Sequence, residues 1–376
     1  MEHVEATIRP AESAAELRAV QGFKYRIYVE EMQRYADIAD HENRLLVEDD
    51  DATSRNFLIE AGGDLAGVVR LTWGGDAGAI RERQIMQYDL APFLEHMTAD
   101  QFVVCERLMI LPRYRGTDLL MQIFGMMMGF CNTRRIQLFF GDSEPHLINT
   151  YLALGFRTYT ENHVNSPATG FLIPLVIVIE DLEYLRRVGS PLVSSLTEFA
   201  DDAQVPSNID MLIAGGAAVQ TQAMSTTEDY IAKIKTAAET AGALQTGLFA
   251  GMTEDEIVTC VGKSLLISCA RGDRVIKEGN VAKNMSLVLT GDFEVIAREK
   301  SVASLGPGDV FGEIAFFLKT PRTADVVAVS EHAQIISFND RTMRQLIEND
   351  AAIAAKLLFN ISTLLCARLD HMNKIA

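Results

Sequence analysis

The sequence has few of the residues and patterns that reveal a metal site, an export route or a membrane anchor. It has five cysteines, an odd number without paired spacing, which argues against a disulfide framework and indicates a reducing cytoplasm. Its seven histidines show no metal-ligand spacing with each other or with cysteine, so we predict no metal site. The N-terminus lacks an apolar signal-peptide core, and the apolar run from Ile173 to Ile179 is far shorter than a membrane span. We therefore expect a cytoplasmic protein without a membrane span.

Basic residues are also scarce. There are 34 lysines and arginines against 51 acidic residues, which gives a formal net charge of −17. Duplex DNA would be repelled by most of such a surface. The chain ends shortly after an expected last helix, which leaves no room there for a helix-turn-helix. We expect no nucleic-acid partner, and a basic partner would be favoured. The oligomeric state stays open.

The length of 376 residues predicts two or three domains. We place a first domain at residues 1–188, a linker with one helix at 189–245, and a second domain at 246–376. The linker is rich in Ser, Thr and Ala, and its helical candidate runs from Thr227 to Ala243. We predict an α+β protein: a mixed α/β sheet comes first, and a β-roll of short strands with terminal helices follows.

The first domain begins, in this interpretation, with a helical entry from Glu5 to Ala39. Two strands joined by Gly62-Gly63 then form a hairpin. The expected elements after it are a central strand at 101–111, a turn at 112–116, an apolar helix at 118–130, a strand at 136–141, a helix at 146–154 and a strand at 170–179.

This order of parts, with Pro112 to Gly116 (PRYRG) and Asn149 to Phe156 (NTYLALGF), resembles the GCN5-related N-acyltransferases over residues 15–185. The resemblance implies a central strand that splays from its neighbour, with an acyl thioester in the gap. The turn after that strand would hold the phosphate of acyl-CoA with backbone N–H groups. The implied donor-binding residues are Met109, Ile110, Leu111, Arg113, Arg115, Gly116 and Thr117.

The turn departs from the family pattern at Asp118 and Leu120, where glycine or alanine is usual. A carboxylate at a phosphate-facing helix start would repel pyrophosphate, although it is a good N-cap. Either the donor carries less phosphate there, or the loop has moved, or no CoA binds. Arg26 to Glu31 and Gly67 to Leu71 also resemble elements of acyl-homoserine lactone and N-acyl amino acid synthases. That second resemblance adds acyl-carrier protein as a donor.

Two residues are candidates for proton transfer. Glu106, in the central strand, would be the general base, with a pKa raised by burial. Alternation along the strand places Arg107 on the other face. A buried structural ion pair is the competing interpretation for Glu106. Tyr151 would protonate the leaving thiolate, or else serve as a core tyrosine. A backbone N–H near Met109 or Ile110 would stabilise the oxyanion.

The last third of the chain contains the stretch from Phe311 to Val326 (FGEIAFFLKTPRTADV). Gly312 allows a close backbone approach, and the residues after it can form a helical turn whose N–H groups face an anion. Glu313 supplies an acceptor for sugar hydroxyls, and Arg322 supplies a guanidinium. Taken singly, such a pair is common on a surface hairpin.

The whole string resembles the phosphate-binding cassette of cyclic nucleotide-binding domains. The resemblance implies that Glu313 holds the ribose 2′-OH, that Arg322 pairs with the cyclic phosphate, and that the last helix covers the base. Thr323 leaves cAMP and cGMP both open. The implied binding residues are Phe311, Gly312, Glu313, Ile314, Ala315, Arg322 and Thr323.

The combined expectation is a bacterial-type N-acyltransferase regulated by a cyclic nucleotide. Its donor would be acyl-CoA or acyl-carrier protein, and its acceptor the amine of a protein lysine or an amino acid. The alternative is a non-catalytic cyclic nucleotide sensor, whose first domain is a scaffold or binds an acyl ligand. Asp118 and Leu120 favour this alternative, whereas Glu106 and Tyr151 favour the enzyme.

Overall fold

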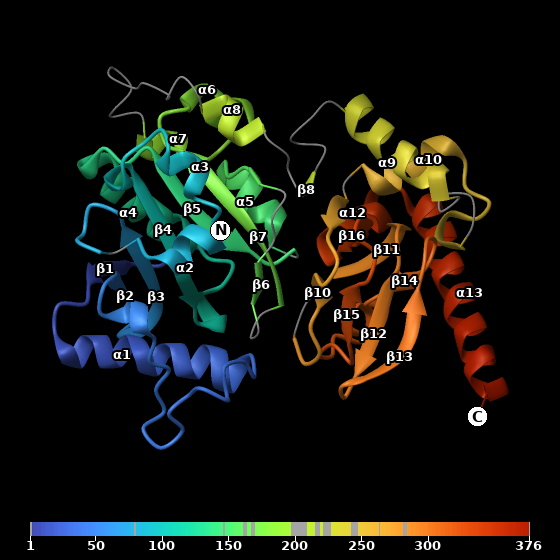
Figure 1. The fold of residues 1–376 in the computed structure, drawn as a ribbon, viewed down its shortest axis with the longest axis horizontal. Helices are drawn as coiled ribbons and strands as arrows, with labels where there is room; N and C mark the ends of the chain where they lie inside the picture. The colour runs from blue at the N-terminus through green and yellow to red at the C-terminus, as the bar shows by residue number, and fades with distance from the viewer. Residues whose placement is uncertain are drawn as a thin grey trace. The chain divides into compact units, whose positions relative to one another are not determined.

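The structure is a computed structural model that divides the chain into two compact units (Figure 1). The N-terminal unit comprises 1–143, 147–162 and 174–216, and the C-terminal unit comprises 144–146, 163–173 and 217–376. The described residues are 2–78, 80–145, 147–160, 164–166, 170–196, 209–214, 219–220, 227–241, 247–262, 264–280 and 284–375. Much of the segment expected to be a linker, and the end of its helical candidate at Gly242 and Ala243, lie outside these residues.

A seven-stranded mixed sheet has the strand order β1-β2-β3-β4-β5-β7-β6. Neighbours from β1 to β4 pair antiparallel, and β4 pairs parallel with β5. The predicted hairpin and central strand are confirmed. The strands are β1 (Ala6–Pro10), β2 (Arg55–Ala61), β3 (Asp64–Trp73), β4 (Phe102–Ile110), β5 (Leu138–Ser143), β6 (Val164–Ser166) and β7 (Gly170–Val178).

The expected helical entry is wrong at its start. Residues Ala6–Pro10 form the edge strand β1, and α1 (Ala14–Lys24) begins only after the N-cap Ser13. After Lys24 the helix widens into a π-helix, η1, at Tyr25–Glu31. The other described helical segments before residue 215 are η2 (Asp49–Asp51), α2 (Glu82–Gln87), α3 (Ala91–Leu94), η3 (Ala99–Gln101), η4 (Pro112–Tyr114), α4 (Leu119–Arg134), α5 (Ile148–Leu154), α6 (Leu182–Arg187), α7 (Val193–Leu196) and α8 (Ile209–Ala214).

Helices cover both faces of this sheet, and neighbouring residues of β2 meet different helices because side chains alternate along a strand. Val20 and Phe23 of α1 pack with Leu58 of β2 and Val68 of β3. On the opposite face, Phe57 contacts Phe130 of α4 edge to face. The core beyond β4 includes Phe93, Phe102, Val104 and Phe140.

Strands β4 and β5 pair only at their beginnings. Phe102, Val103 and Val104 pair with Leu138, Phe139 and Phe140, although β4 continues to Ile110 and β5 to Ser143. The register of β4 against β3 also shifts between Val68 and Arg70. Such a shift marks a β-bulge, which bends the strand that carries it. The two strands therefore diverge in their second halves.

The C-terminal unit is built on two antiparallel sheets that form a β-roll, with strand orders β10-β15-β12-β13 and β14-β11-β16-β9-β8. The strands are β8 (Val219–Gln220), β9 (Leu265–Cys269), β10 (Arg274–Ile276), β11 (Asn284–Thr290), β12 (Phe293–Ala297), β13 (Lys300–Leu305), β14 (Val310–Phe311), β15 (Asp325–Ala328) and β16 (Ala333–Asn339). The helical segments are α9 (Thr227–Ala241), η7 (Gly247–Phe249), α10 (Glu254–Val261), α11 (Glu313–Leu318), α12 (Asp340–Asn349) and α13 (Ala351–Ile375).

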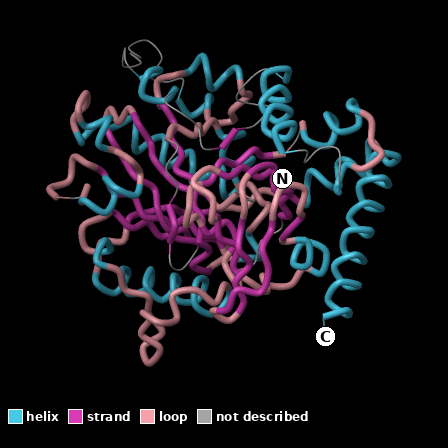
Figure 2. The backbone as a smooth tube through the Cα atoms, turned by 45° about the vertical axis from the view of Figure 1, so that its right-hand side comes forward, coloured by secondary structure: helices cyan, strands magenta, loops and turns pink. Residues whose placement is uncertain are grey.

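Two helices of this unit pack onto the roll. Tyr230 and Ile234 of α9 are buried in the same core as Leu357 and Ile361 of α13. Figure 2 shows α13 as one long continuous helix that leads to the C-terminus. Among the described helices, α13 is long and apolar enough over Ala351–Asp370 to cross a membrane by length and composition alone, and only 17% of that stretch is buried. This stretch was not among the features predicted from the sequence.

Candidate functional site

The centre of the C-terminal site is the turn at Gly312, which begins α11. Gly312 has a φ of 77°, in the left-handed region that favours glycine. A Cβ atom there would lie 2.5 Å from Nη1 of Arg322. Glycine is therefore needed both for the backbone conformation and for the approach of the guanidinium.

Arg322 is only 5% exposed, and the described contacts of its guanidinium are with neutral oxygens. Nη1 donates to the carbonyl of Gly312 at 2.6 Å, and Nη2 donates to the carbonyl and Oδ1 of Asn284 at 2.6 and 2.7 Å. Burial lowers the pKa of Arg322 to about 10, and the charge of Glu313 opposes that shift. The guanidinium stays charged at neutral pH, so the structure holds a buried cation that can attract an anion.

The other predicted cassette residues differ in their surroundings. Glu313 is 6% exposed in the first turn of α11, with Ala315 buried beside it. Phe311 packs against Phe293 with ring centroids 5.9 Å apart, so it serves the core. Ile314 and Thr323 are exposed. The carboxylate of Glu313 and the guanidinium of Arg322 are thus buried, whereas Ile314 and Thr323 are exposed.

Comparison with known proteins decides what this site is. Residues 266–350, which include the cassette, match the protein-family model described as the cyclic nucleotide-binding domain. The chain carries a C-terminal cyclic nucleotide-binding domain. The predicted sensor is confirmed to that extent.

Curated relatives and solved structures are also similar to a part of the chain. A cGMP-dependent protein kinase of Drosophila melanogaster is 31% identical over 112 residues, which are 27% of this chain and 15% of the kinase. A CRP-like cAMP-activated global transcriptional regulator of Mycobacterium tuberculosis is 25% identical over 117 residues, 30% of this chain and 52% of the regulator. The chain thus spans about half or less of the length of these relatives. A cyclic nucleotide-binding domain from Methylobacillus flagellatus has a TM-score of 0.34 at 21% identity and covers 41% of this chain and 85% of that structure.

Two residues outside the cassette contact it and were not predicted from the sequence. Arg368 of α13 donates from Nη1 to Oε1 of Glu313 at 3.1 Å, and its Nη2 lies 3.4 Å from Oδ1 of Asp309. The predicted acceptor for ribose hydroxyls is therefore already paired with the last helix. Asn284 was missed as well. Both residues lie far from the cassette in sequence, so no local pattern could have indicated them.

In the N-terminal unit, Glu106 is part of a buried ionic network. Arg70 Nη2 donates to its Oε2 at 3.2 Å, and Arg83 Nη2 donates to its Oε1 at 2.9 Å. Burial alone would raise the pKa of Glu106, but Arg70, Arg83 and Arg107 outweigh it and lower the pKa. The expectation of a raised pKa was wrong, because the sequence did not show how many arginines surround this carboxylate.

Arg107 does not lie on the opposite face from that network, as alternation predicted. Its φ is 56°, in the left-handed region, at the bulge of β4. Its guanidinium forms an ion pair with Glu48, whose Oε2 also accepts from Lys24 at 2.9 Å and from Arg70 at 3.3 Å. The bulge breaks the two-residue repeat and brings neighbouring side chains to one cluster.

Acidic residues around η2 complete the network. Asp51 accepts from Lys24 at 2.6 Å, and Asp50 pairs with Arg81 and with Arg83. Two buried donors in this region, Arg70 Nε and Gln84 Nε2, have no hydrogen-bond partner among the described residues. The run of acidic residues before a strand was the available signal, but only the fold brings it to the arginines.

Tyr151, the predicted acid, lies on α5 with its ring packed among aromatic side chains. Its centroid is 5.3 Å from that of Phe156 and 6.5 Å from that of Phe124. The residue as a whole is partly exposed. Tyr151 as a proton donor remains a prediction.

The predicted donor-binding turn is engaged by the protein itself. Arg113 pairs with Asp64, and Arg115 Nη1 donates to Glu31 Oε1 at 2.7 Å. Thr117 Oγ1 donates to the carbonyl of Tyr114 at 2.8 Å. Gly116 adopts a φ of 89°. The turn lies beside the end of β4, where Met109 and Leu111 are buried and Ile110 is partly exposed.

Asp118 anchors the beginning of the chain at the start of α4. Its Oδ1 accepts from the backbone N–H of Val4 at 2.9 Å, and His3 Nδ1 lies 2.6 Å from its Oδ2. The N–H of Asp118 in turn donates to the carbonyl of Glu2 at 3.0 Å. A residue that departs from the family pattern thus binds residues 2–4 where the resemblance implied a phosphate.

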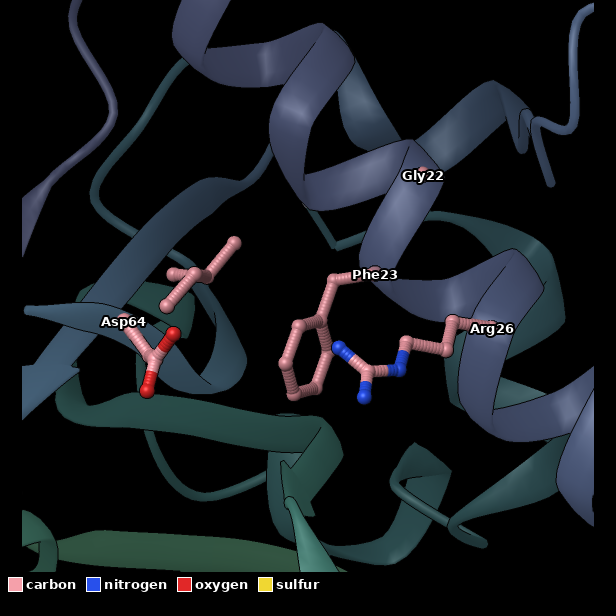
Figure 3. A pocket seen from close by; sticks show the side chains of 5 residues that line it. Gly22, Phe23, Arg26 and Asp64 are labelled. Atoms are coloured by element: carbon pink, nitrogen blue, oxygen red, sulfur yellow. The ribbon is translucent and has the colours of Figure 1, made fainter.

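A shallow pocket lies between α1, η1 and the start of β3 (Figure 3). Phe23 and Leu65 give it an apolar floor, and Arg26 and Asp64 border it. Arg26 belongs to the stretch that resembles acyl-homoserine lactone synthases, and Asp64 is paired with Arg113. The pocket is too open to define a ligand by itself.

Proposed function

We propose that the chain is a cyclic nucleotide-regulated N-acyltransferase, in which the C-terminal unit senses the nucleotide and the N-terminal unit transfers an acyl group to an amine. The observation that carries the sensing part is the buried guanidinium of Arg322, which has only neutral oxygen partners among its described contacts and lies against Gly312. Arg322 would pair with the cyclic phosphate, and Glu313 would accept the ribose hydroxyl. The relatives named above include both cAMP- and cGMP-dependent proteins, so both nucleotides are candidates.

Acyl transfer is supported by the divergence of β4 and β5 beyond Val104 and Phe140. Beyond these pairs, the rest of β4 to Ile110 and the rest of β5 to Ser143 are not paired with each other. A thioester placed there would be close to the polar residues of the bulged strand. Acyl-CoA and acyl-carrier protein are the proposed donors, and an amino acid or a protein lysine the proposed acceptor.

Regulation requires that the nucleotide bind two states of the protein with different affinities. The contact between Arg368 and Glu313 supplies one such difference, because a ribose hydroxyl and the guanidinium use the same carboxylate. We propose that nucleotide binding changes this contact and, through α13, the state of the C-terminal unit.

A non-catalytic sensor is the second candidate, and the contacts of Asp118 favour it. The start of α4 binds residues 2–4 through that side chain, so it does not present a bare anion site. In this alternative the N-terminal unit would serve as a scaffold or hold an acyl ligand without turning it over.

Calorimetric titrations separate the candidates. cAMP and cGMP are titrated alone, and acetyl-CoA and octanoyl-CoA are titrated in the absence and in the presence of each nucleotide. We expect a cyclic nucleotide to bind and to change the affinity for an acyl-CoA. Nucleotide binding with no response to either acyl-CoA would favour acyl-carrier protein as the donor or the non-catalytic scaffold. No binding of either nucleotide would contradict the sensing role.

A further inference from the structure

Asp142 lies on β5 at the place where β5 separates from β4. The last paired residues of the two strands are Val104 and Phe140. Glu106 and Asp142 each come two residues later, so strand alternation puts both carboxylates on the face of Val104 and Phe140. Arg70 of β3 is the registered partner of Glu106. A row of ionisable side chains therefore crosses three adjacent strands and ends at Asp142.

The two carboxylates in this row have opposite surroundings. Glu106 is held by Arg70 and Arg83, whereas Asp142 accepts from Tyr88 Oη at 2.9 Å and from Gln87 Nε2 at 3.0 Å, both neutral donors. Both of these bonds end on Oδ2. No described residue donates a hydrogen bond to Oδ1, and the side chain is only half-buried. One oxygen of Asp142 is thus available to a bound molecule.

The pKa of Asp142 is raised to about 6: burial is the main cause and the charge of Glu106 adds to it, whereas Tyr88, Arg107 and Gln87 oppose the shift. Tyr88, Cys105 and Tyr159 also lie within the electrostatic reach of this carboxylate. Glu106 has its pKa shifted in the opposite direction. Neighbouring carboxylates with divergent pKa values commonly have separate roles, one permanently ionised and one that exchanges protons near neutral pH.

We infer that Asp142, rather than Glu106, is the general base that takes the proton from the attacking amine at the divergence of β4 and β5. This role rests on the proposed acyl transfer. The amine nitrogen bonds to the thioester carbonyl carbon, and its proton passes to Asp142 Oδ1 as the carbon–sulfur bond breaks. The thiolate leaves and takes a proton from water, and Asp142 releases its proton to solvent. Glu106 stays ionised and positions Arg70 and Arg83.

Tyr88 is the positioning residue in this arrangement. It is fully buried, and Tyr159 donates to its carbonyl, so its phenol is fixed against Asp142. A rigid donor on Oδ2 leaves the proton-accepting oxygen in one orientation.

The test measures thiol release from octanoyl-CoA and from S-octanoyl-N-acetylcysteamine, a thioester without phosphate. The acceptors are the twenty amino acids and Nα-acetyl-lysine, with and without cAMP or cGMP.

We compare Asp142→Asn with Asp76→Asn. Asp76 is a half-buried carboxylate of the same unit that pairs with Arg55. General-base loss typically costs about 10²–10⁴-fold, so we expect kcat of Asp142→Asn to fall by that factor. The KM for the thioester should change less than about threefold. Asp76→Asn should behave as wild type.

Two further readouts distinguish a base from a structural residue. The wild-type rate should rise with pH through a limb near the pKa of about 6, and this limb should be absent from the residual rate of Asp142→Asn. At pH 8 the Tm of Asp142→Asn should equal or exceed that of wild type. A carboxyl group with a raised pKa destabilises the fold once it is ionised, and the amide cannot ionise. The asparagine oxygen can still accept from Tyr88.

Unchanged turnover and an unchanged acidic limb in Asp142→Asn would overturn the role of Asp142 while leaving acyl transfer intact. A wild type that releases no thiol from either thioester would contradict the proposed transfer and this role with it. A ¹³C titration of the aspartate carboxyl groups tests the site independently of turnover. The signal of Asp142 is the one that disappears in Asp142→Asn. If that signal does not titrate near pH 6, the role is also overturned.

Discussion

The two units bury arginines in contrasting ways. Arg70 in the N-terminal unit is 1% exposed and pairs with Glu48, Asp51 and Glu106. Arg322 in the cyclic nucleotide-binding domain is 5% exposed, and its described hydrogen bonds end on carbonyl and amide oxygens. The charge of Arg70 is compensated by the protein, whereas most of the charge of Arg322 is left for a ligand. The partners of a buried cation therefore indicate whether it stabilises the fold or is available to bind an anionic ligand.

Removing the compensated arginine should have the largest effect on stability. Arg70→Leu leaves several carboxylates buried without a counter-charge, which typically costs about 3–5 kcal/mol. Urea unfolding would measure the change in the free energy of unfolding. Arg113→Leu is the matched control, because its pair with Asp64 is exposed and contributes little to stability. Equal losses of unfolding free energy in Arg70→Leu and Arg113→Leu would contradict the expectation that the buried ion pairs of Arg70 contribute more than an exposed pair.

Removing the uncompensated arginine should act on binding instead. Arg322→Leu deletes the proposed partner of the cyclic phosphate, and we expect nucleotide affinity to fall by about 100-fold or more, since a charge-assisted pair in a buried site is lost. Stability should fall less than in Arg70→Leu. The bonds removed join a charged donor to neutral oxygens, each worth about 1.5–3 kcal/mol, and the desolvation cost of the buried cation is removed with them. Calorimetry and urea unfolding provide both numbers. A stability loss as large as that of Arg70→Leu, with affinity retained, would contradict the assignment.

A third arginine is less buried than the other two, and its removal should have the smallest effect. Arg368 is partly exposed and pairs with Glu313 at 3.1 Å. If this guanidinium competes with a ribose hydroxyl, Arg368→Gln should increase nucleotide affinity by about two- to fivefold, in line with a pair worth up to about 1 kcal/mol. Arg344→Gln, which loses an exposed pair with Asp340, is the control. A fall in affinity would instead make Arg368 part of the binding site.

The sequence predicted best where the chemistry is contiguous. Gly312, Glu313 and Arg322 lie within one short stretch, and the fold brings them together because a tight turn and a hairpin suffice. The alternating strands around Gly62-Gly63 and the central strand were likewise readable, since each is defined by a local repeat.

Features that depend on distant parts of the chain were not readable. The partners of Arg322 and Glu313, namely Asn284 and Arg368, come from β11 and α13. The bulge at Arg107 carries no glycine to mark it, and it overturned the expected alternation. Strand β1 was hidden because the helical pattern after Ser13 was extended backwards over it. Asp142 looked like any polar residue at a strand end until the divergence of β4 and β5 was known.

The hydrogen bonds between residues 2–4 and Asp118 also bear on the order of folding. They join parts of the chain that are 114 and 115 residues apart in sequence. Closing a loop of that length costs about 4 kcal/mol in chain entropy by the logarithmic rule. The first residues therefore cannot take their final place during synthesis until α4 has emerged. In the finished protein they are held by few bonds, so they should be among the first segments to detach, well before the sheet itself opens.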